Sequence, residues 1–89
     1  MLKPRQLERI VKGFANHRRI EILELLEKKP GLSVVDISNT LKVNFKTISE
    51  HIRRLTIAGL VYKRNRGASV LHKLSPRALG ILKFLRTLE

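Results

Sequence analysis

Two short segments of helical periodicity, separated by a brief turn, constrain the fold of this chain more than any other feature. The first opens at Ser33, which is followed three residues later by Asp36, a spacing close to that of a capping box. The second follows Asn44, a residue type that caps helix N-termini, and only Lys42-Val43 lies between the two segments. This spacing predicts two short helices joined by a tight turn, which is the arrangement of a helix-turn-helix.

Three further helices flank this pair. Apolar residues at helical steps predict a first helix near residues 4–15 and a last helix near residues 75–88, with Ser75 as the cap of the last one. Another helix begins after the capping residue Asn16 and ends at Pro30-Gly31, because proline cannot continue a helix and glycine favours its C-terminal end. The chain is therefore expected to be mainly helical.

A change of periodicity after Gly59 indicates a β-hairpin. Residues 60–64 and 69–74 are short runs enriched in Val, Leu and Tyr, and residues 65–68 between them have the composition of a turn. The order of elements predicts a mainly α fold with a small β-hairpin (α+β), namely a winged helix-turn-helix with about five helices and a two-stranded wing. A chain of 89 residues supports one compact core, so residues 1–89 are expected to form a single domain.

Positive charge is concentrated in the part of the chain that holds the helix-turn-helix and the hairpin. The formal net charge is +12, and residues 42–77 contain nine lysines or arginines against one acid, Glu50. Such an asymmetry favours docking on a polyanion, because neutralised phosphates release condensed counterions. On charge alone, the alternative is the highly charged surface typical of thermophilic proteins.

The residue types that are missing narrow the function classes. The chain has no cysteine, so it has no disulfide, no thiolate metal site and no thiol nucleophile, and it fits a reducing compartment. We find no export signal and no run of about 20 apolar residues that could span a bilayer, and we expect a soluble, cytoplasmic protein with no membrane partner. Because no carboxylate pair, catalytic triad or glycine-rich phosphate loop is recognisable, the sequence predicts no enzyme.

The histidines do not form a metal site by sequence. His17, His51 and His72 fall on three separate expected elements, with no acidic cluster beside them, whereas a metal site needs three or four convergent ligands. We therefore expect no metal and no cofactor. A phosphate contact is the expected role of His51, and His72 is expected at the surface.

Four segments, in this order and with these gaps, resemble the ArsR-type regulators, a family of winged helix-turn-helix transcriptional regulators. The similarity runs from about Ala15 to Pro76, and the segments are 16–23 (NHRRIEIL), 32–37 (LSVVDI), 47–55 (TISEHIRRL) and 58–61 (AGLV). The resemblance implies a protein that binds duplex DNA and regulates transcription.

Two positions depart from the family pattern. Family members usually have glycine in the turn where this chain has Lys42, so either Lys42 adopts a left-handed conformation or the turn differs. Metal-sensing members carry cysteines near the start of the third helix, where this chain has Ser33 and Val35. Thiolate metal sensing at that site is therefore excluded, and the last helix also lacks the His and acid ligands that some relatives use for zinc.

The resemblance implies that the fourth helix enters the major groove of DNA. We assign base-edge contacts to residues near its N-terminal half: Phe45, Lys46, Ser49 and Glu50. Phosphate contacts are expected from Thr47, Arg53 and Arg54, and minor-groove or flanking backbone contacts from Lys63, Arg64 and Arg66. The alternatives are that Phe45 packs into the core, that Glu50 pairs with an arginine one turn away, and that the hairpin tip is an ordinary solvated turn.

The first and last helices carry more apolar side chains than a small monomer can cover, and the resemblance implies that they pair across a two-fold axis. The expected dimer residues are Leu7, Ile10, Phe14, Leu82, Phe84, Leu85 and Leu88. The alternative is that these side chains complete the core of each monomer.

The sequence thus predicts a dimeric, sequence-specific repressor that binds double-stranded DNA. The alternatives are a non-specific architectural protein that coats DNA, and a winged-helix module for RNA or protein interaction. Whether an effector binds is left open.

Overall fold

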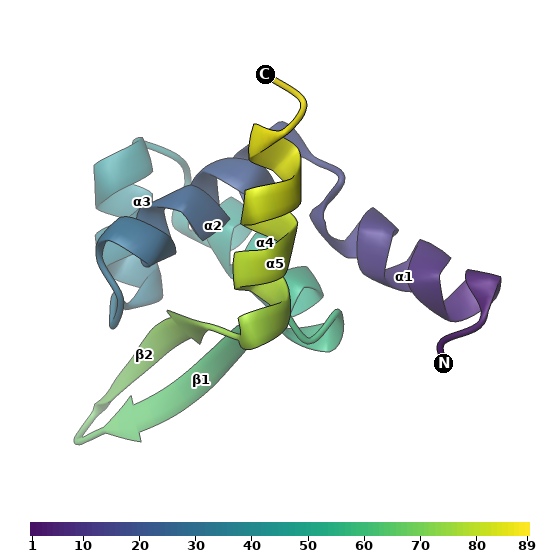
Figure 1. Ribbon diagram of the computed structural model, residues 1–89. Coiled ribbons are helices and arrows are strands. Elements are labelled where there is room, and N and C mark those ends of the chain that lie inside the picture. The colour runs from purple at the N-terminus through teal and green to yellow at the C-terminus, as the bar shows by residue number, and fades with distance from the viewer.

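The computed structural model describes residues 1–89 and consists of five helices and a two-stranded antiparallel hairpin (Figure 1). The elements in chain order are α1 (Pro4–Phe14), α2 (His17–Lys28), α3 (Val34–Leu41), α4 (Phe45–Ile57), β1 (Val61–Arg66), β2 (Ser69–Leu74) and α5 (Pro76–Arg86). Figure 1 shows α1 leading away from the other helices, with the hairpin extending from the opposite side. This element order confirms the predicted winged helix-turn-helix.

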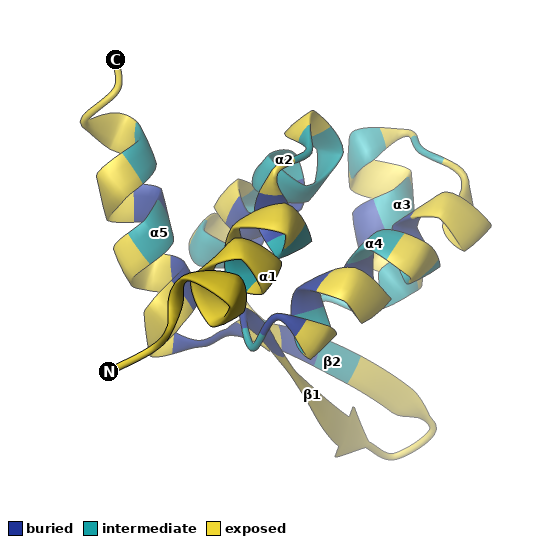
Figure 2. Ribbon diagram, turned by 90° about the vertical axis from the view of Figure 1, so that its right-hand side faces the viewer, coloured by how far each residue is buried: buried dark blue, intermediate teal, exposed yellow.

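The core lies where α2, α4 and α5 meet the base of the hairpin. Figure 2 shows the buried residues on the inner faces of these elements, whereas α1 and the end of the hairpin are largely exposed. The inner face of α4 is fully buried, because Ile48, Ile52 and Leu55 are each at most 1% exposed. The other buried apolar residues are Phe14, Ile22, Leu23, Leu26, Ile37, Ala58, Leu60, Val61, Leu74, Ala78 and Leu82.

The predicted helix caps form as the sequence indicates. Asn16 Oδ1 accepts hydrogen bonds from the first turn of α2, including the Arg18 amide at 2.9 Å. The Ser33 hydroxyl accepts a hydrogen bond from the Asp36 amide, and the Asp36 carboxylate accepts one from the Ser33 amide, both at 3.1 Å. These two bonds complete the capping box of α3. The Ser75 hydroxyl accepts from the first turn of α5. Local side-chain chemistry thus fixes where these three helices begin.

The hairpin is longer than predicted and its turn is shorter. Strand β1 continues to Arg66, which pairs with Ser69, so only Gly67 and Ala68 form the turn. Gly67 has a φ of +59°, and glycine in a left-handed conformation at the first central position is the requirement of a type II′ turn. The predicted four-residue turn is therefore wrong by two residues, because glycine lets the strands pair up to Arg66.

The base of the hairpin is attached to the loop before α3 through His72. This residue is 1% exposed, so the predicted surface position is wrong. The His72 amide and the ring Nδ1 both lie within 2.9 Å of the Leu32 carbonyl, and the Gly31 amide donates to the His72 carbonyl. Burial lowers the pKa of His72, since charging the ring inside the protein would cost desolvation energy.

Two residues assigned to the dimer surface belong to the core of the protomer itself. Phe14 is 9% exposed and Leu82 is 2% exposed, so the alternative expectation that they complete the monomer core holds for them. Of the other five, Ile10 and Leu85 are half-buried, and three are exposed: Leu7, Phe84 and Leu88. Leu88 is 68% exposed, because it lies beyond the end of α5.

Helix α1 is held against α4 by a very close contact. A Cβ added to Gly13 would lie 2.5 Å from the Ala58 Cβ, so the two helices approach too closely at this point for a larger residue. No helix in this structure combines the length and apolar character that crossing a membrane requires.

Candidate nucleic-acid interface

The turn between α3 and α4 sets the position of the predicted recognition helix. Lys42 adopts φ 56° and ψ 45°, so of the two alternatives left open by the sequence, the left-handed lysine is the one that occurs. The Ser38 hydroxyl donates to the Val43 carbonyl at 2.6 Å, and the Val43 amide donates to the Ser38 carbonyl at 3.1 Å. Asn44 Oδ1 then accepts from the Lys46 amide at 2.8 Å. These bonds stabilise the turn and fix where α4 begins.

The outer face of α4 is open to solvent and carries most of the predicted DNA-contacting residues. Phe45 is 51% exposed, which overturns the alternative that it packs into the core. Ser49 is half-buried, and the other predicted residues of this helix are exposed: Lys46, Thr47, Glu50, Arg53 and Arg54. The helix therefore presents a ring, hydroxyl groups and cations along one uncovered side.

The Glu50 carboxylate accepts hydrogen bonds from two arginines in the protein without DNA. Arg53 donates from Nη2 at 2.7 Å and from Nε at 3.0 Å, and Arg54 donates from Nε at 3.1 Å. The hydrogen bonds from Arg53 are the main reason that the pKa of Glu50 falls to about 2, with Arg54 acting in the same direction. The structure thus shows the pairing that was the alternative for Glu50, and the carboxylate orients two cations on the outer face.

The register of the hairpin divides the predicted wing cations between its two faces. Lys63 pairs with the buried His72, whereas side chains two residues apart share a face, so Arg64 and Arg66 lie together on the other side. Lys73 pairs with Tyr62 and joins the face of Arg64 and Arg66. Lys73 was missed by the sequence reasoning because only the strand register, not the charge pattern, reveals it.

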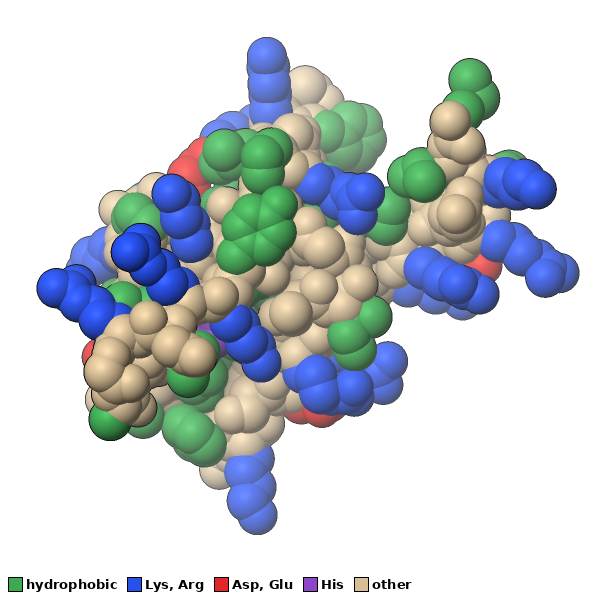
Figure 3. Space-filling view, turned by 90° about the horizontal axis from the view of Figure 1, so that it is seen from below, with side chains coloured by type: hydrophobic (Ala, Val, Ile, Leu, Met, Phe, Trp, Pro, Cys, Tyr) green, Lys and Arg blue, Asp and Glu red, His purple; other side chains and the backbone are tan.

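Cations dominate the underside of the molecule. In Figure 3, lysine and arginine side chains protrude around the body and beside the hairpin, and only a few acidic groups are visible between them. The nine cations of residues 42–77 are all exposed at this surface or elsewhere on the protein: Lys42, Lys46, Arg53, Arg54, Lys63, Arg64, Arg66, Lys73 and Arg77. This distribution gives the helix-turn-helix and the wing the potential that attracts a polyanion.

His51 lies at the side of α4, turned toward the neighbouring helices. Its Nδ1 accepts a hydrogen bond from Arg19 Nε at 3.1 Å, and Arg19 Nη1 also donates to the Gly13 carbonyl at 3.2 Å. Burial, followed by the charge of Arg19, lowers the pKa of His51. This neutral ring therefore connects α4 to α2 and α1. Its expected phosphate contact stays a prediction. No three His, Asp or Glu side chains are grouped so that they could hold a metal ion.

Comparison with known proteins gives the same assignment from sequence and from structure. Residues 16–63 match the family described as "Bacterial regulatory protein, arsR family". The chain is 32% identical over 82 residues to the transcriptional repressor PagR of Bacillus anthracis, covering 90% of this chain and 81% of PagR.

Solved structures of similar proteins share the fold. The homodimeric winged helix-turn-helix DNA-binding domain Mb0332 of Mycobacterium bovis, described as a possible ArsR-family transcriptional regulator, has a TM-score of 0.84 at 26% identity, covering 93% of this chain and 77% of that one. Reduced HlyU from Vibrio cholerae has a TM-score of 0.80 at 30% identity, covering 93% of this chain and 87% of that one. These matches are to regulators and confirm the prediction that the protein is not an enzyme. Because the family match spans more than half of the chain and includes the whole helix-turn-helix, the protein belongs to the arsR family of bacterial transcriptional regulators and has a winged helix-turn-helix DNA-binding fold.

Proposed function

We propose that the protein is a sequence-specific repressor that binds double-stranded DNA as a homodimer and does not sense metals through thiolates. The observation that carries the proposal is the uncovered, cationic side of α4, presented directly after a helix-turn-helix turn and flanked by a cationic wing. The similarity to PagR, a transcriptional repressor, supports the sign of regulation. The absence of cysteine from the sequence supports the proposal that the protein does not sense metals through thiolates.

In this function α4 lies in the major groove. Lys46 donates to guanine, the Ser49 hydroxyl donates or accepts, and the exposed ring of Phe45 contacts a thymine methyl group. Glu50 has a cytosine amino group as its base partner, and it reaches that group by releasing its bonds to Arg53 or Arg54. The freed guanidinium groups, together with Thr47, then contact phosphates.

The wing contacts the duplex beside the recognition helix. Arg64 and Arg66 share one face of the hairpin and enter the minor groove or bind the flanking backbone, as narrow A·T tracts attract arginine. Lys63 is on the opposite face and binds phosphate without reading sequence. This part of the interface contributes affinity and salt dependence more than specificity.

A homodimer brings two recognition helices to one face of DNA. Leu7 on α1 is 48% exposed and Phe84 on α5 is 57% exposed, and Leu88 just after α5 is exposed as well, so apolar surface is left uncovered on both helices. The half-buried Ile10 and Leu85 complete the proposed interface, without Phe14 and Leu82. The similar Mycobacterium bovis domain is described as homodimeric. A two-fold axis would place the α4 helices about one duplex turn apart, roughly 34 Å, which matches an inverted repeat.

The decisive experiment compares two duplexes by fluorescence anisotropy. One carries the DNA upstream of the protein's own gene, and the other has the same composition in shuffled order. We expect the specific duplex to bind at least about 1,000-fold more tightly at physiological salt. Lys46→Ala should lower the specific affinity about tenfold, because one good base contact contributes roughly 1–3 kcal/mol. Lys28→Ala, which removes an exposed lysine of α2, is the matched control and should leave affinity unchanged.

Equal affinity for both duplexes would indicate an architectural protein, and no binding of either would indicate an RNA or protein-interaction module. Transcription in vitro from the bound promoter should fall as protein is added. Light scattering should give twice the chain mass of 10.3 kDa at tens of micromolar, and a monomer at that concentration would contradict the dimer.

A further inference from the structure

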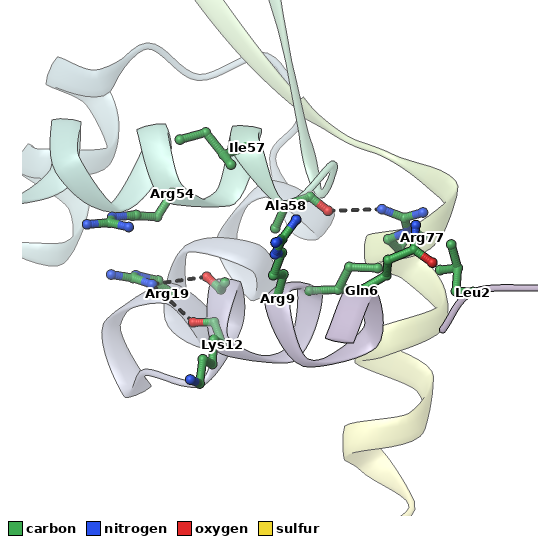
Figure 4. Close-up of a pocket in the computed structure, with 11 residues that line it drawn as sticks. Leu2, Gln6, Arg9, Lys12, Arg19, Arg54, Ile57, Ala58 and Arg77 are labelled. Carbon is green, nitrogen blue, oxygen red and sulfur yellow. Dashed lines mark hydrogen bonds between the residues drawn. The ribbon is translucent and has the colours of Figure 1, made fainter. Parts of the chain in front are cut away.

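A basic cleft lies between α1, the C-terminal half of α4 and the start of α5 (Figure 4). Its volume is about 590 Å³, and five of its lining side chains are cations: Arg9, Lys12, Arg19, Arg54 and Arg77. No aspartate or glutamate lines it. Among the residues assigned to duplex DNA, only Arg54 takes part. The basic cleft is therefore a second concentration of positive charge, next to the recognition surface and largely separate from it.

Two of these arginines are held in place by backbone carbonyls. Arg19 Nη1 lies 3.2 Å from the Gly13 oxygen, at the C-terminal end of α1, and Arg77 Nη1 donates to the Ala58 oxygen at 3.0 Å. In the view of Figure 4, Arg9 rises from α1 toward α4, while Arg19 and Arg54 lie at the other end of the cleft and point away from Arg9. Guanidinium groups that are already positioned lose little conformational entropy when a ligand binds.

The charge of the basic cleft is poorly compensated within the protein. Arg9, Arg19 and Arg77 form no salt bridge, whereas Arg54 pairs with Glu50 and Lys12 lies 3.5 Å from Glu8. Cations that share a cleft without carboxylates repel one another, and a bound polyanion relieves that repulsion. The cleft therefore favours an occupant with more than one negative charge.

Apolar side chains form the remaining wall. Ile57 is 69% exposed and Leu2 is 42% exposed, and both lie beside the cations. Neither Leu2 nor Ile57 belongs to the proposed dimer interface, so both stay available to a ligand in the homodimer. Small-molecule sites in proteins have volumes of roughly 300–1,000 Å³ and combine apolar walls with a few polar groups, a combination that this cleft shares.

We propose that the basic cleft binds a small phosphorylated molecule with at least two phosphate groups. The arginines contact the phosphates, and the wall of Leu2 and Ile57 takes the uncharged part of the ligand. Since the cleft is built from both α1 and α4, its occupancy is thermodynamically linked to the position of the recognition helix. That linkage, unlike the binding itself, rests on the proposed DNA-binding function.

The test uses inorganic pyrophosphate as the probe, in low salt and without DNA. In two-dimensional NMR spectra of the full chain, the amide of Gly13 in the cleft should shift at a lower pyrophosphate concentration than the amide of Gly67 at the wing tip. Arg9→Gln should weaken binding about three- to tenfold, the range for losing one partly exposed charge contact. Arg5→Gln is the matched control, because Arg5 is an exposed arginine of the same helix that does not line the cleft, and it should change binding less than about twofold.

Equal weakening by the two substitutions, or an earlier shift of Gly67, would overturn the site. Duplex binding measured without pyrophosphate distinguishes the two sources of phosphate. Arg9→Gln should leave the affinity for duplex DNA unchanged, and a loss of that affinity would assign the cleft to the DNA interface instead. ADP should bind more tightly than pyrophosphate, and equal affinities would refute the role of the apolar wall. A wild-type protein that ignores DNA yet binds pyrophosphate at Gly13 would contradict the proposed function and leave this site standing.

Discussion

Replacing Lys42 by glycine should stabilise the protein, because the turn between α3 and α4 forces this lysine into a left-handed conformation. Its φ is 56° and its ψ is 45°, and it is the only non-glycine residue with a positive φ. An L-residue with a Cβ loses roughly 1–2 kcal/mol in this region. Glycine adopts it without that cost, although the extra freedom of glycine in the unfolded chain returns about 0.4–1 kcal/mol. The net expectation for Lys42→Gly is a gain of about 0.5–1 kcal/mol in the free energy of unfolding.

The size of the chain converts this gain into a temperature. Unfolding entropies of roughly 2.1 cal/mol/K per residue predict that an 89-residue domain gains about 3–5 °C in Tm. Calorimetry measures this rise in Tm, at one fixed protein concentration because the Tm of a dimer depends on concentration. Lys42→Ala is the control, because it removes the same charge and keeps the Cβ. If the alanine variant gained as much as the glycine variant, charge repulsion and not backbone conformation would be the cause, and the argument would be refuted.

The other predictions concern the wing, the contact of α1 with α4, and the two histidines whose pKa is lowered. Replacing both Arg64 and Arg66 by alanine should weaken binding similarly on all duplexes. It should also reduce the slope of log affinity against log salt concentration by up to about two, measured by anisotropy titrations at several salt concentrations. An unchanged slope would contradict the wing contact. Gly13→Val should lower the free energy of unfolding in urea by about 1–3 kcal/mol, because its side chain overlaps α4, and no loss would mean that α1 moves freely. The pKa values of His51 and His72 are lowered in the folded protein, so the unfolded chain takes up protons first as the pH drops. The free energy of unfolding should therefore fall between pH 7.5 and pH 5.5. Constant stability across that range in urea titrations would show that neither ring is kept neutral by folding.

The pairing of Glu50 with Arg53 and Arg54 has a consequence for recognition. All three side chains are about half exposed, so these bonds stabilise the fold little, because solvent screens exposed ion pairs. Their effect is to hold the two guanidinium groups on the outer face of α4 before DNA arrives. A base contact by Glu50 therefore competes with the arrangement of the cations beside it.

Short-range chemistry, readable from the sequence, determined the order of the elements and the starts of the helices. Asn16, Ser33 and Ser75 cap the residues that directly follow them, and Asn44 sets the start of α4 in the same way. These bonds span two or three residues, so no distant partner decides them. The concentration of cations around α4 and the hairpin was equally visible, because charge is a property of composition.

Only the tertiary structure decided which side chains are buried and which surfaces meet. By periodicity alone, Phe14 and Leu7 of α1 are equivalent, yet Phe14 enters the core and Leu7 stays exposed, because α1 approaches α4 closely near Gly13, beside Phe14. His72 is buried because the Leu32 carbonyl, forty residues away in the chain, lies beside its ring. The basic cleft takes its lining from α1, α2, α4 and α5, so residues from both ends of the chain meet in it. Burial and proximity depend on partners that a local pattern does not contain, so folding had to bring those partners together first.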